Sequence, residues 1–98
     1  MIYSIRKILE IVTPIAKKYC VETVWLFGSY ARGEATEDSD IDLLIDGGKI
    51  RTLFQFTALR LELEDALGKR VDLITTGNND PSFLQRIRKD EVKIYEAA

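Results

Sequence analysis

The chain has 98 residues, of which 46% are hydrophobic and 31% are charged, and its formal net charge is −2. These values predict one globular domain over residues 1–98 and argue against a general nucleic-acid binder, which would carry a clear basic excess. A single nucleotide is still a suitable ligand, because it needs only a local positive site.

One cysteine, Cys20, and no histidine are present. An intrachain disulfide is therefore impossible, and a zinc site is not expected. We expect Cys20 to be buried at the end of the first helix. The N-terminal segment carries charges within its apolar pattern, and no stretch is long and apolar enough to span a membrane. We therefore expect neither a signal peptide nor a transmembrane helix. We expect the protein to be cytoplasmic.

The first predicted element is a helix that begins near Ile5. Apolar residues recur over residues 5–19 at the spacing of one helical face, and Ser4 is a suitable N-cap. Pro14 interrupts the pattern, because a proline inside a helix removes a hydrogen bond and clashes with the preceding turn. We expect a kink or a helix in two pieces, packed on the core.

Two strands follow, joined by a polar segment. Residues 23–27 are rich in β-branched and aromatic side chains and end at Gly28, which predicts a strand. A short helical turn is expected over residues 29–33 and a polar loop over 34–38, before a second strand over 39–45. The expected faces of that strand are Ile41, Leu43 and Ile45 toward the core, and Asp40, Asp42 and Leu44 on the other side.

A long helix is predicted over residues 51–67, between the Gly47-Gly48 break and a C-terminal glycine, Gly68. Its expected core-facing residues are Leu53, Phe56, Leu59, Leu63, Ala66 and Leu67. The opposite side carries Phe54, Ala58 and Leu61. Three apolar residues in register there indicate either an interface or a face covered by the C-terminal segment, and the sequence favours neither.

The last elements are a strand, a helix and a final strand. Residues 71–74 form an apolar run with one carboxylate, Asp72, and residues 75–79 are expected to form a loop. Asp80 and Pro81 are a helix-start signal, and the alternation over residues 92–95 predicts the last strand. Together these elements predict an α/β (α+β) fold, with a small mixed sheet and helices packed on it.

Asp40 and Asp42 are the first candidates for a functional site. Residues two apart in a strand project from the same face, so these carboxylates would lie side by side. Like charges at such a short distance repel each other, and a divalent cation would neutralise them. Mg²⁺ prefers hard oxygen ligands and usually takes few carboxylates, which leaves positions for substrate phosphates. Asp72 is either a strand-end residue facing water or a third ligand.

The Gly28-Ser29 pair supplies candidate phosphate ligands. Gly28 has no side chain, so a ligand can approach its backbone, and a helix starting after Ser29 would turn free N–H groups toward an anion. Arg32 could add a charge that forks onto phosphate oxygens. Ser39 either orients the aspartates or simply forms a turn.

The segment Gly28-Ser29-Tyr30-Ala31-Arg32-Gly33, followed by Ser39-Asp40-Ile41-Asp42-Leu43, resembles the signature of the DNA polymerase β superfamily of nucleotidyltransferases. The form is closest to the minimal nucleotidyltransferase (MNT) family. These are small prokaryotic proteins, often encoded beside a helical HEPN-domain toxin. The resemblance covers nearly the whole chain and implies a polymerase β-like core, with Asp72 as the third carboxylate on a later strand.

The resemblance implies metal-assisted nucleotidyl transfer from ATP. One Mg²⁺ held by Asp40 and Asp42 would bridge the triphosphate, and a second, held by these residues and Asp72, would activate the acceptor hydroxyl. Asp72 could instead act as a general base. The residues implied to bind the nucleotide are Gly28, Ser29, Arg32 and Ser39. The implied acceptor is a cognate HEPN toxin, neutralised by AMP, and tyrosine is the hydroxyl residue that suits the reaction best.

Two alternatives stay open. A small-molecule nucleotidyltransferase of the aminoglycoside-modifying type would share the motif, but such enzymes usually carry an extra helical domain that 98 residues cannot hold. A catalytically silent antitoxin would neutralise its partner by binding alone, and the presence of all three carboxylates argues against it. Labelled ATP and the partner protein would separate the three cases.

Overall fold

The computed structural model describes residues 2–77 and 80–98. The elements, in chain order, are α1 (Ile5–Lys18), β1 (Thr23–Phe27), α2 (Gly28–Arg32), β2 (Ile41–Asp46), α3 (Leu53–Leu67), β3 (Val71–Thr75), α4 (Pro81–Ile87) and β4 (Val92–Glu96). The predicted α/β fold is confirmed. The predicted loop over residues 75–79 starts too early, because Thr75 still pairs within β3, and its residues Asn78 and Asn79 lie outside the described part of the chain.

The four strands form one mixed sheet in the order β3-β2-β1-β4. Strand β1 is antiparallel to both of its neighbours, whereas β2 and β3 are parallel. Helix α3 joins the parallel pair, since parallel neighbours need a crossover connection. The register sets Asp42 of β2 opposite Phe27 of β1 on one side and opposite Asp72 of β3 on the other.

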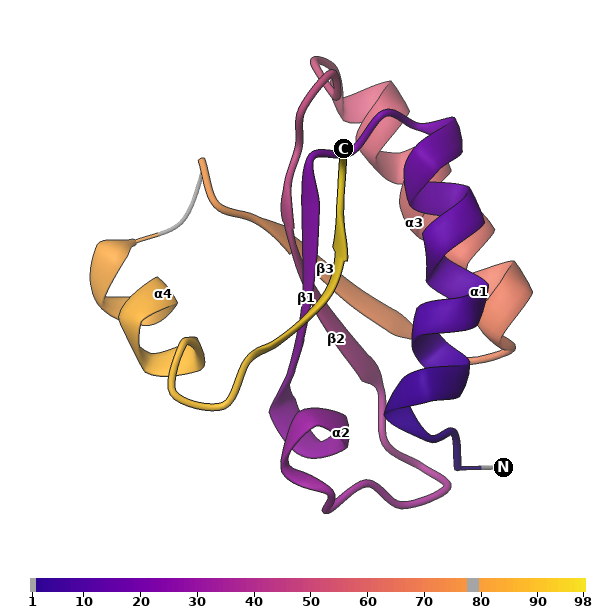
Figure 1. Cartoon of the computed structure of the whole chain (residues 1–98), viewed down its shortest axis with the longest axis vertical. Helices are drawn as coiled ribbons and strands as arrows, with labels where there is room; N and C mark the ends of the chain where they lie inside the picture. The colour runs from indigo at the N-terminus through magenta and orange to yellow at the C-terminus, as the bar shows by residue number, and fades with distance from the viewer. Residues whose placement is uncertain (1, 78–79) are drawn as a thin grey trace.

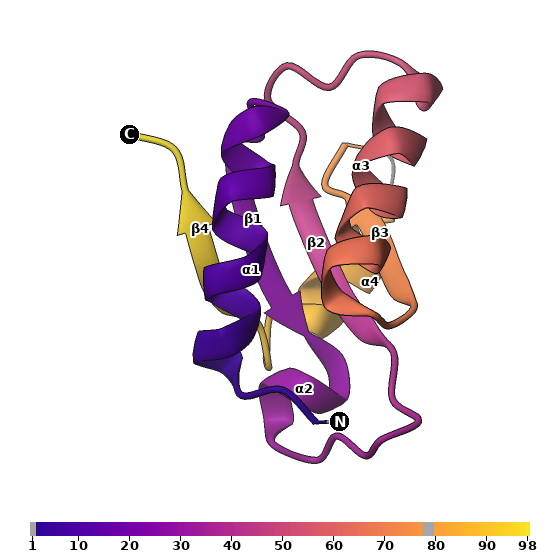
Figure 2. The same ribbon diagram turned by 90° about the vertical axis from the view of Figure 1, so that its right-hand side faces the viewer.

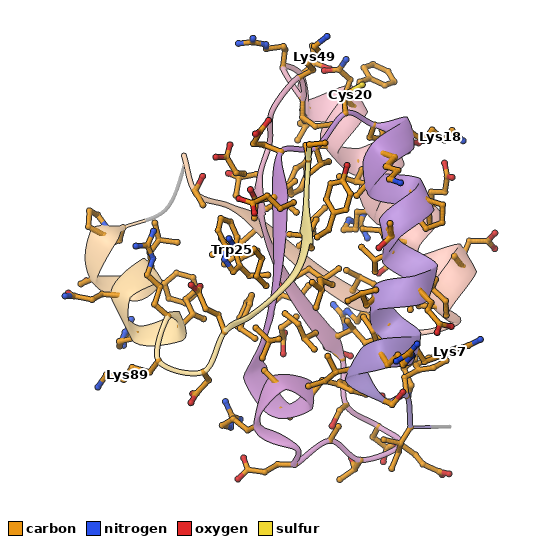
Figure 3. All side chains as sticks on the ribbon, in the orientation of Figure 1. Lys7, Lys18, Cys20, Trp25, Lys49 and Lys89 are labelled. Atoms are coloured by element: carbon orange, nitrogen blue, oxygen red, sulfur yellow. The ribbon has the colours of Figure 1, made fainter. Side chains whose placement is uncertain are left out.

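Two helices cover one face of the sheet. Figures 1 and 2 show α1 and α3 side by side on this face and α4 on the opposite one. The core lies beneath α1 and α3, and the predicted core residues of β2, Ile41, Leu43 and Ile45, are all buried in it. Leu44 and its neighbour Trp25 belong to the other face, and Figure 3 shows Trp25 on the side of α4.

Helix α1 is capped as predicted but is not divided. The N–H of Lys7 donates to Oγ of Ser4 at 3.1 Å, which confirms the N-cap. The helix runs unbroken through Pro14, so the expectation of two pieces is wrong. Both Pro14 and Glu10, whose carbonyl loses its helical donor, lie on the exposed side, where water can replace the missing hydrogen bond.

Cys20 is exposed, which corrects the prediction that it is buried. Helix α1 ends in a Schellman motif, in which the N–H of Cys20 donates to the carbonyl of Lys17 and the N–H of Val21 to that of Ala16. Cys20 takes the left-handed position of this motif, with φ of 57°. That position usually holds glycine and lies at the surface, so the backbone, rather than the polarity of the thiol, decides the exposure of Cys20.

Helix α3 starts in a capping box formed by Thr52 and Gln55 and ends at Gly68, which has the predicted left-handed conformation. Its core-facing residues are Leu59, Leu63 and Leu67, with Phe56 partly buried. Two predictions are wrong, because Leu53 is 79% exposed and Ala66 is exposed. The helix carries apolar residues on every side, so periodicity alone does not select the core face.

The outer side of α3 remains open. Phe54, Ala58 and Leu61 are all exposed. The last strand, β4, pairs with β1 at the opposite edge of the sheet from β3. The alternative that the C-terminal segment covers these three residues is therefore wrong.

Helix α4 begins as predicted but is not part of the core. Asp80 accepts a hydrogen bond from the N–H of Ser82 at 3.0 Å, with Pro81 in the first turn. None of the residues of α4 is buried. Within residues 2–77 and 80–98, no helix has both the length and the apolar character needed to cross a membrane.

Candidate active site

The predicted carboxylates come together at one end of β2 and β3. Asp42 and Asp72 are direct partners in the parallel ladder, so they project from the same face, opposite α1 and α3. Asp40 lies just before β2. Asp40 and Asp72 are exposed, whereas Asp42 is half-buried. Asp72 is therefore on the face that the two-metal hypothesis requires, and not on the far side of the sheet.

Electrostatics single out Asp42. The pKa of its carboxyl group is raised from an ordinary 3.8 to about 6. Burial is the main cause, the negative charges of Asp72 and Asp40 add to it, and Arg32 opposes it. A carboxylate that is partly withdrawn from water beside two others gains most from a proton or a cation.

The acidic group fits Mg²⁺ in chemistry without forming a closed cage. As the side chains lie, the described residues contain no group of three or more acidic, histidine or cysteine residues arranged to hold a metal ion. The donors are nevertheless hard oxygens on one face, and Asp42 is unfavourable as a free anion. The two-ion site stays a prediction.

Gly28 lies directly against the carboxyl group of Asp42. A Cβ atom at Gly28 would lie 2.1 Å from Oδ2 and 3.0 Å from Cγ of Asp42. The φ of Gly28 is +72°, a conformation that side chains disfavour. The sequence predicts that a ligand approaches the free space at Gly28, and the structure shows that the Asp42 side chain occupies it. Only the strand register, which pairs Phe27 with Asp42, could have indicated this contact.

Ser29 lies in the first turn of α2. This helix begins at Gly28, one residue earlier than predicted, and its N-cap residue, Phe27, makes no side-chain hydrogen bond to it. The helix start therefore has no side-chain cap, and it lies next to Asp42 at the end of β1. Whether Ser29 and these N–H groups bind phosphate stays a prediction.

Arg32 already has acidic neighbours. Its Nε lies 2.7 Å from Oε1 of Glu34, and its Nη1 lies 3.8 Å from Oδ2 of Asp90. All three side chains are exposed, so a phosphate can compete for the guanidinium. The influence of Arg32 on the pKa of Asp42 places it on the side of the acidic group. Asp90 was not predicted, because its contact joins segments far apart in the sequence.

Ser39 forms a turn with Thr36. Its Oγ accepts a hydrogen bond from the N–H of Thr36 at 2.9 Å, and its own N–H donates to the carbonyl of Thr36 at 3.1 Å. Of the two roles proposed for Ser39, the turn is the one that these hydrogen bonds support. They fix the loop that delivers Asp40 to the start of β2.

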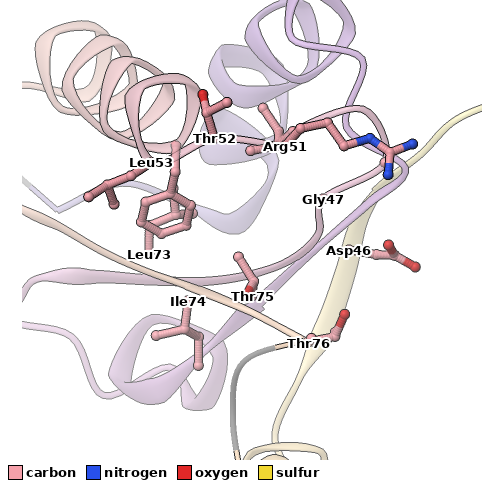
Figure 4. Close-up of a pocket in the computed structure, with 13 residues that line it drawn as sticks. Asp46, Gly47, Arg51, Thr52, Leu53, Leu73, Ile74, Thr75 and Thr76 are labelled. Atoms are coloured by element: carbon pink, nitrogen blue, oxygen red, sulfur yellow. The ribbon is translucent and has the colours of Figure 1, made fainter.

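A groove lies at the other end of the same strands. It has a volume of about 600 Å³ and is lined by the loop after β2, by Thr75 and Thr76, and by Leu53 and Phe56 of α3 (Figure 4). None of the predicted site residues lines it. We place the active site at the acidic end, because charge and a perturbed pKa decide the chemistry and cavity volume does not.

Comparison with known proteins finds a family match and similar relatives. Residues 10–98 match the family described as polymerase beta, nucleotidyltransferase. Protein adenylyltransferase MntA of Thermococcus cleftensis is 36% identical over 80 residues, which cover 82% of this chain and 81% of the relative.

Solved structures share the fold. A candidate minimal nucleotidyltransferase is 34% identical with a TM-score of 0.77, over 92% of this chain and 95% of that one. A chain in the complex of a tri-AMPylated HEPN toxin with an MNT antitoxin, from Shewanella oneidensis, is 17% identical with a TM-score of 0.74, over 95% of this chain and 73% of that one. At that identity the likeness concerns the fold alone. Because the family match spans the sheet, α2 and all three carboxylates, the chain belongs to the polymerase β-type nucleotidyltransferases.

Proposed function

We propose that this chain is a Mg²⁺-dependent protein adenylyltransferase. It transfers AMP from ATP to a hydroxyl group of a cognate HEPN-domain toxin and thereby acts as an antitoxin. The observation that carries the proposal is the pairing of Asp42 with Asp72 beside the Gly28-Ser29 start of α2. It is supported by a relative named protein adenylyltransferase MntA and by the shared fold with a chain of the complex that contains an AMPylated HEPN toxin.

Each part of the proposed reaction has a candidate residue. Asp40, Asp42 and Asp72 would hold Mg²⁺, which neutralises charge on the triphosphate and lowers the pKa of the acceptor. Ser29 and the start of α2 receive the terminal phosphates, and Arg32 exchanges its acidic neighbours for phosphate oxygens.

The transfer itself is an in-line displacement. The acceptor oxygen attacks the α-phosphorus, the bond to the β-phosphate breaks, and diphosphate leaves. The acceptor proton passes to a base, and Asp72 is the exposed candidate on this face. Tyrosine suits the acceptor role because its hydroxyl pKa, ~10, is the lowest among hydroxyl side chains.

Purified chain, purified partner, Mg²⁺ and ATP labelled on the α-phosphate test the proposal, with Asp42→Asn as the inactive control. The expected result is label on the partner, with AMP on a tyrosine by peptide mass spectrometry. Label on a small molecule would favour the aminoglycoside-type alternative. An unmodified partner whose toxicity is still suppressed would show that the chain acts by binding alone.

A further inference from the structure

Helix α3 carries a line of residues that faces away from the core. Phe54, Ala58, Leu61 and Asp65 follow each other at alternating spacings of four and three, which places them along one side of a helix, as in a coiled coil. Phe54 is 90% exposed and Leu61 53% exposed, and Ala58 and Asp65 are exposed as well. These four residues are called the α3 seam below.

The exposed side of helix α1 differs in composition from that of α3. Helix α1 lies beside α3 on the same face of the sheet (Figure 2). The exposed side of α1 carries the charged residues Arg6, Lys7, Glu10, Lys17 and Lys18. Helix α3, in contrast, is apolar toward the core and again along most of the seam. Apolar residues that gather on an exposed helix face mark a surface suited to being covered.

A second copy of the chain fits the seam poorly. A parallel pair would set Asp65 against its own copy, and an antiparallel pair would set it against Phe54. Either arrangement buries an unpaired carboxylate, which is costly.

The charge at the end of the seam calls for a basic partner. Glu62 and Glu64 are already paired with Lys18 and Arg60. Asp65 forms no ion pair or hydrogen bond within the described part of the chain. A partner surface is therefore complementary to the seam if it presents apolar side chains along its length and a lysine or arginine opposite Asp65.

We propose that the α3 seam docks an amphipathic helix of the protein that accepts AMP, with a basic residue of that helix opposite Asp65. The inference rests on the proposed function for the identity of this partner. The four-three spacing is the pattern by which one helix packs on another. The seam and the carboxylates lie on opposite sides of the sheet, with the edge strand β3 between them. The docked partner thus leaves the acidic face free, and a flexible segment reaches it around β3.

The test measures binding of the purified product of the adjacent reading frame by isothermal titration calorimetry. Phe54→Glu and Leu61→Glu should each weaken binding about 30-fold or more, the effect of losing a central apolar contact. Ile2→Glu is the matched control, because Ile2 is 52% exposed, carries the same apolar-to-acid change, and lies outside the seam. Asp65→Lys should weaken binding by about tenfold through repulsion of the basic residue.

Separate readouts distinguish failure of this inference from failure of the proposed function. Circular dichroism checks folding, and Phe54→Ser repeats the test without added charge if Phe54→Glu melts early. Unchanged affinity in a folded seam variant overturns the docking inference even if AMP is transferred, as does no binding by the unaltered chain. Dimers of the chain alone that Leu61→Glu disperses would assign the seam to a second copy instead. Weakened binding with no AMP transfer would leave docking supported and the proposed function refuted.

Discussion

Replacing Gly28 with alanine tests whether the missing side chain at this position is needed to make room for the carboxyl group of Asp42. The new Cβ would lie 2.1 Å from Oδ2, whereas ordinary contact begins at 3.4 Å. The carboxyl group would therefore have to move by more than about 1 Å, a shift that can cost ~100-fold in rate at a catalytic group. Alanine would also have to adopt a φ of +72°, which costs about 1–2 kcal/mol.

Gly33 provides a matched control for the backbone term. Its φ is +74°, but a Cβ there would meet nothing within 4 Å. Gly33→Ala should therefore carry only the free-energy cost of the positive φ, which lowers the melting temperature by roughly 4–8 °C per kcal/mol. This variant should retain most of the AMP transfer. Gly28→Ala should melt lower still and lose ~99% of its transfer rate.

Thermal unfolding followed by circular dichroism measures the first effect, and AMP transfer at saturating ATP measures the second. The two variants should differ in both. If Gly28→Ala is as stable and as active as Gly33→Ala, the close approach of Gly28 to Asp42 is not needed for stability or transfer, and the prediction is refuted.

Three further predictions concern charge and backbone. Because the pKa of Asp42 is raised to about 6 in the folded chain, ionisation of Asp42 destabilises the metal-free fold progressively between about pH 4 and pH 6. Asp42→Asn should therefore raise the melting temperature of the metal-free chain at pH 7.5 but not at pH 4. It should also abolish AMP transfer and remove stabilisation by Mg²⁺. A lower melting temperature at pH 7.5 would contradict this prediction. Glu64→Ala should lower the free energy of unfolding in urea by about 1–2 kcal/mol, because Oε2 of Glu64 accepts from the N–H of the buried Val71 at 3.0 Å. Glu10→Ala, which removes the exposed ion pair with Arg6, is its control and should cost less than about 1 kcal/mol. Cys20→Gly should raise the melting temperature, because Cys20 holds a left-handed φ of 57° that glycine adopts without strain, and an unchanged value would exclude that strain.

Local signals account for what the sequence predicted well. The period-two alternation of β2 predicts both of its faces correctly, with Ile41 toward the core and Asp42 on the opposite side. Caps and turn glycines located the ends of the helices, including Ser4 and Gly68. Asp72 could be assigned to the acidic group only through the resemblance to a family, because no local pattern states which strand will become the neighbour of β2.

The errors arise where local pattern and tertiary position diverge. Helix α3 has apolar residues on several sides, so its periodicity predicts Leu53 and Ala66 in a core that they do not reach. Cys20 ends an apolar helical pattern, which predicts burial, whereas the backbone conformation of the helix end places it at the surface. The ion pair of Arg32 with Asp90 joins α2 to the turn before β4, and such long-range contacts leave no trace in sequence spacing.

The parallel pairing of β2 with β3 also determines when the acidic site comes into existence. Asp42 and Asp72 become neighbours only after α3 has crossed over and delivered β3 to the sheet, and such non-local closure is the slow part of folding. A growing chain that ends after β2 contains the whole Gly28-to-Asp42 segment but no complete site. The pairing of β3 with β2 must also bring two like charges together, so a divalent cation that binds both acids would speed this step. Competence to bind metal and nucleotide is thus acquired when β3 pairs with β2, and its appearance during refolding would time that event.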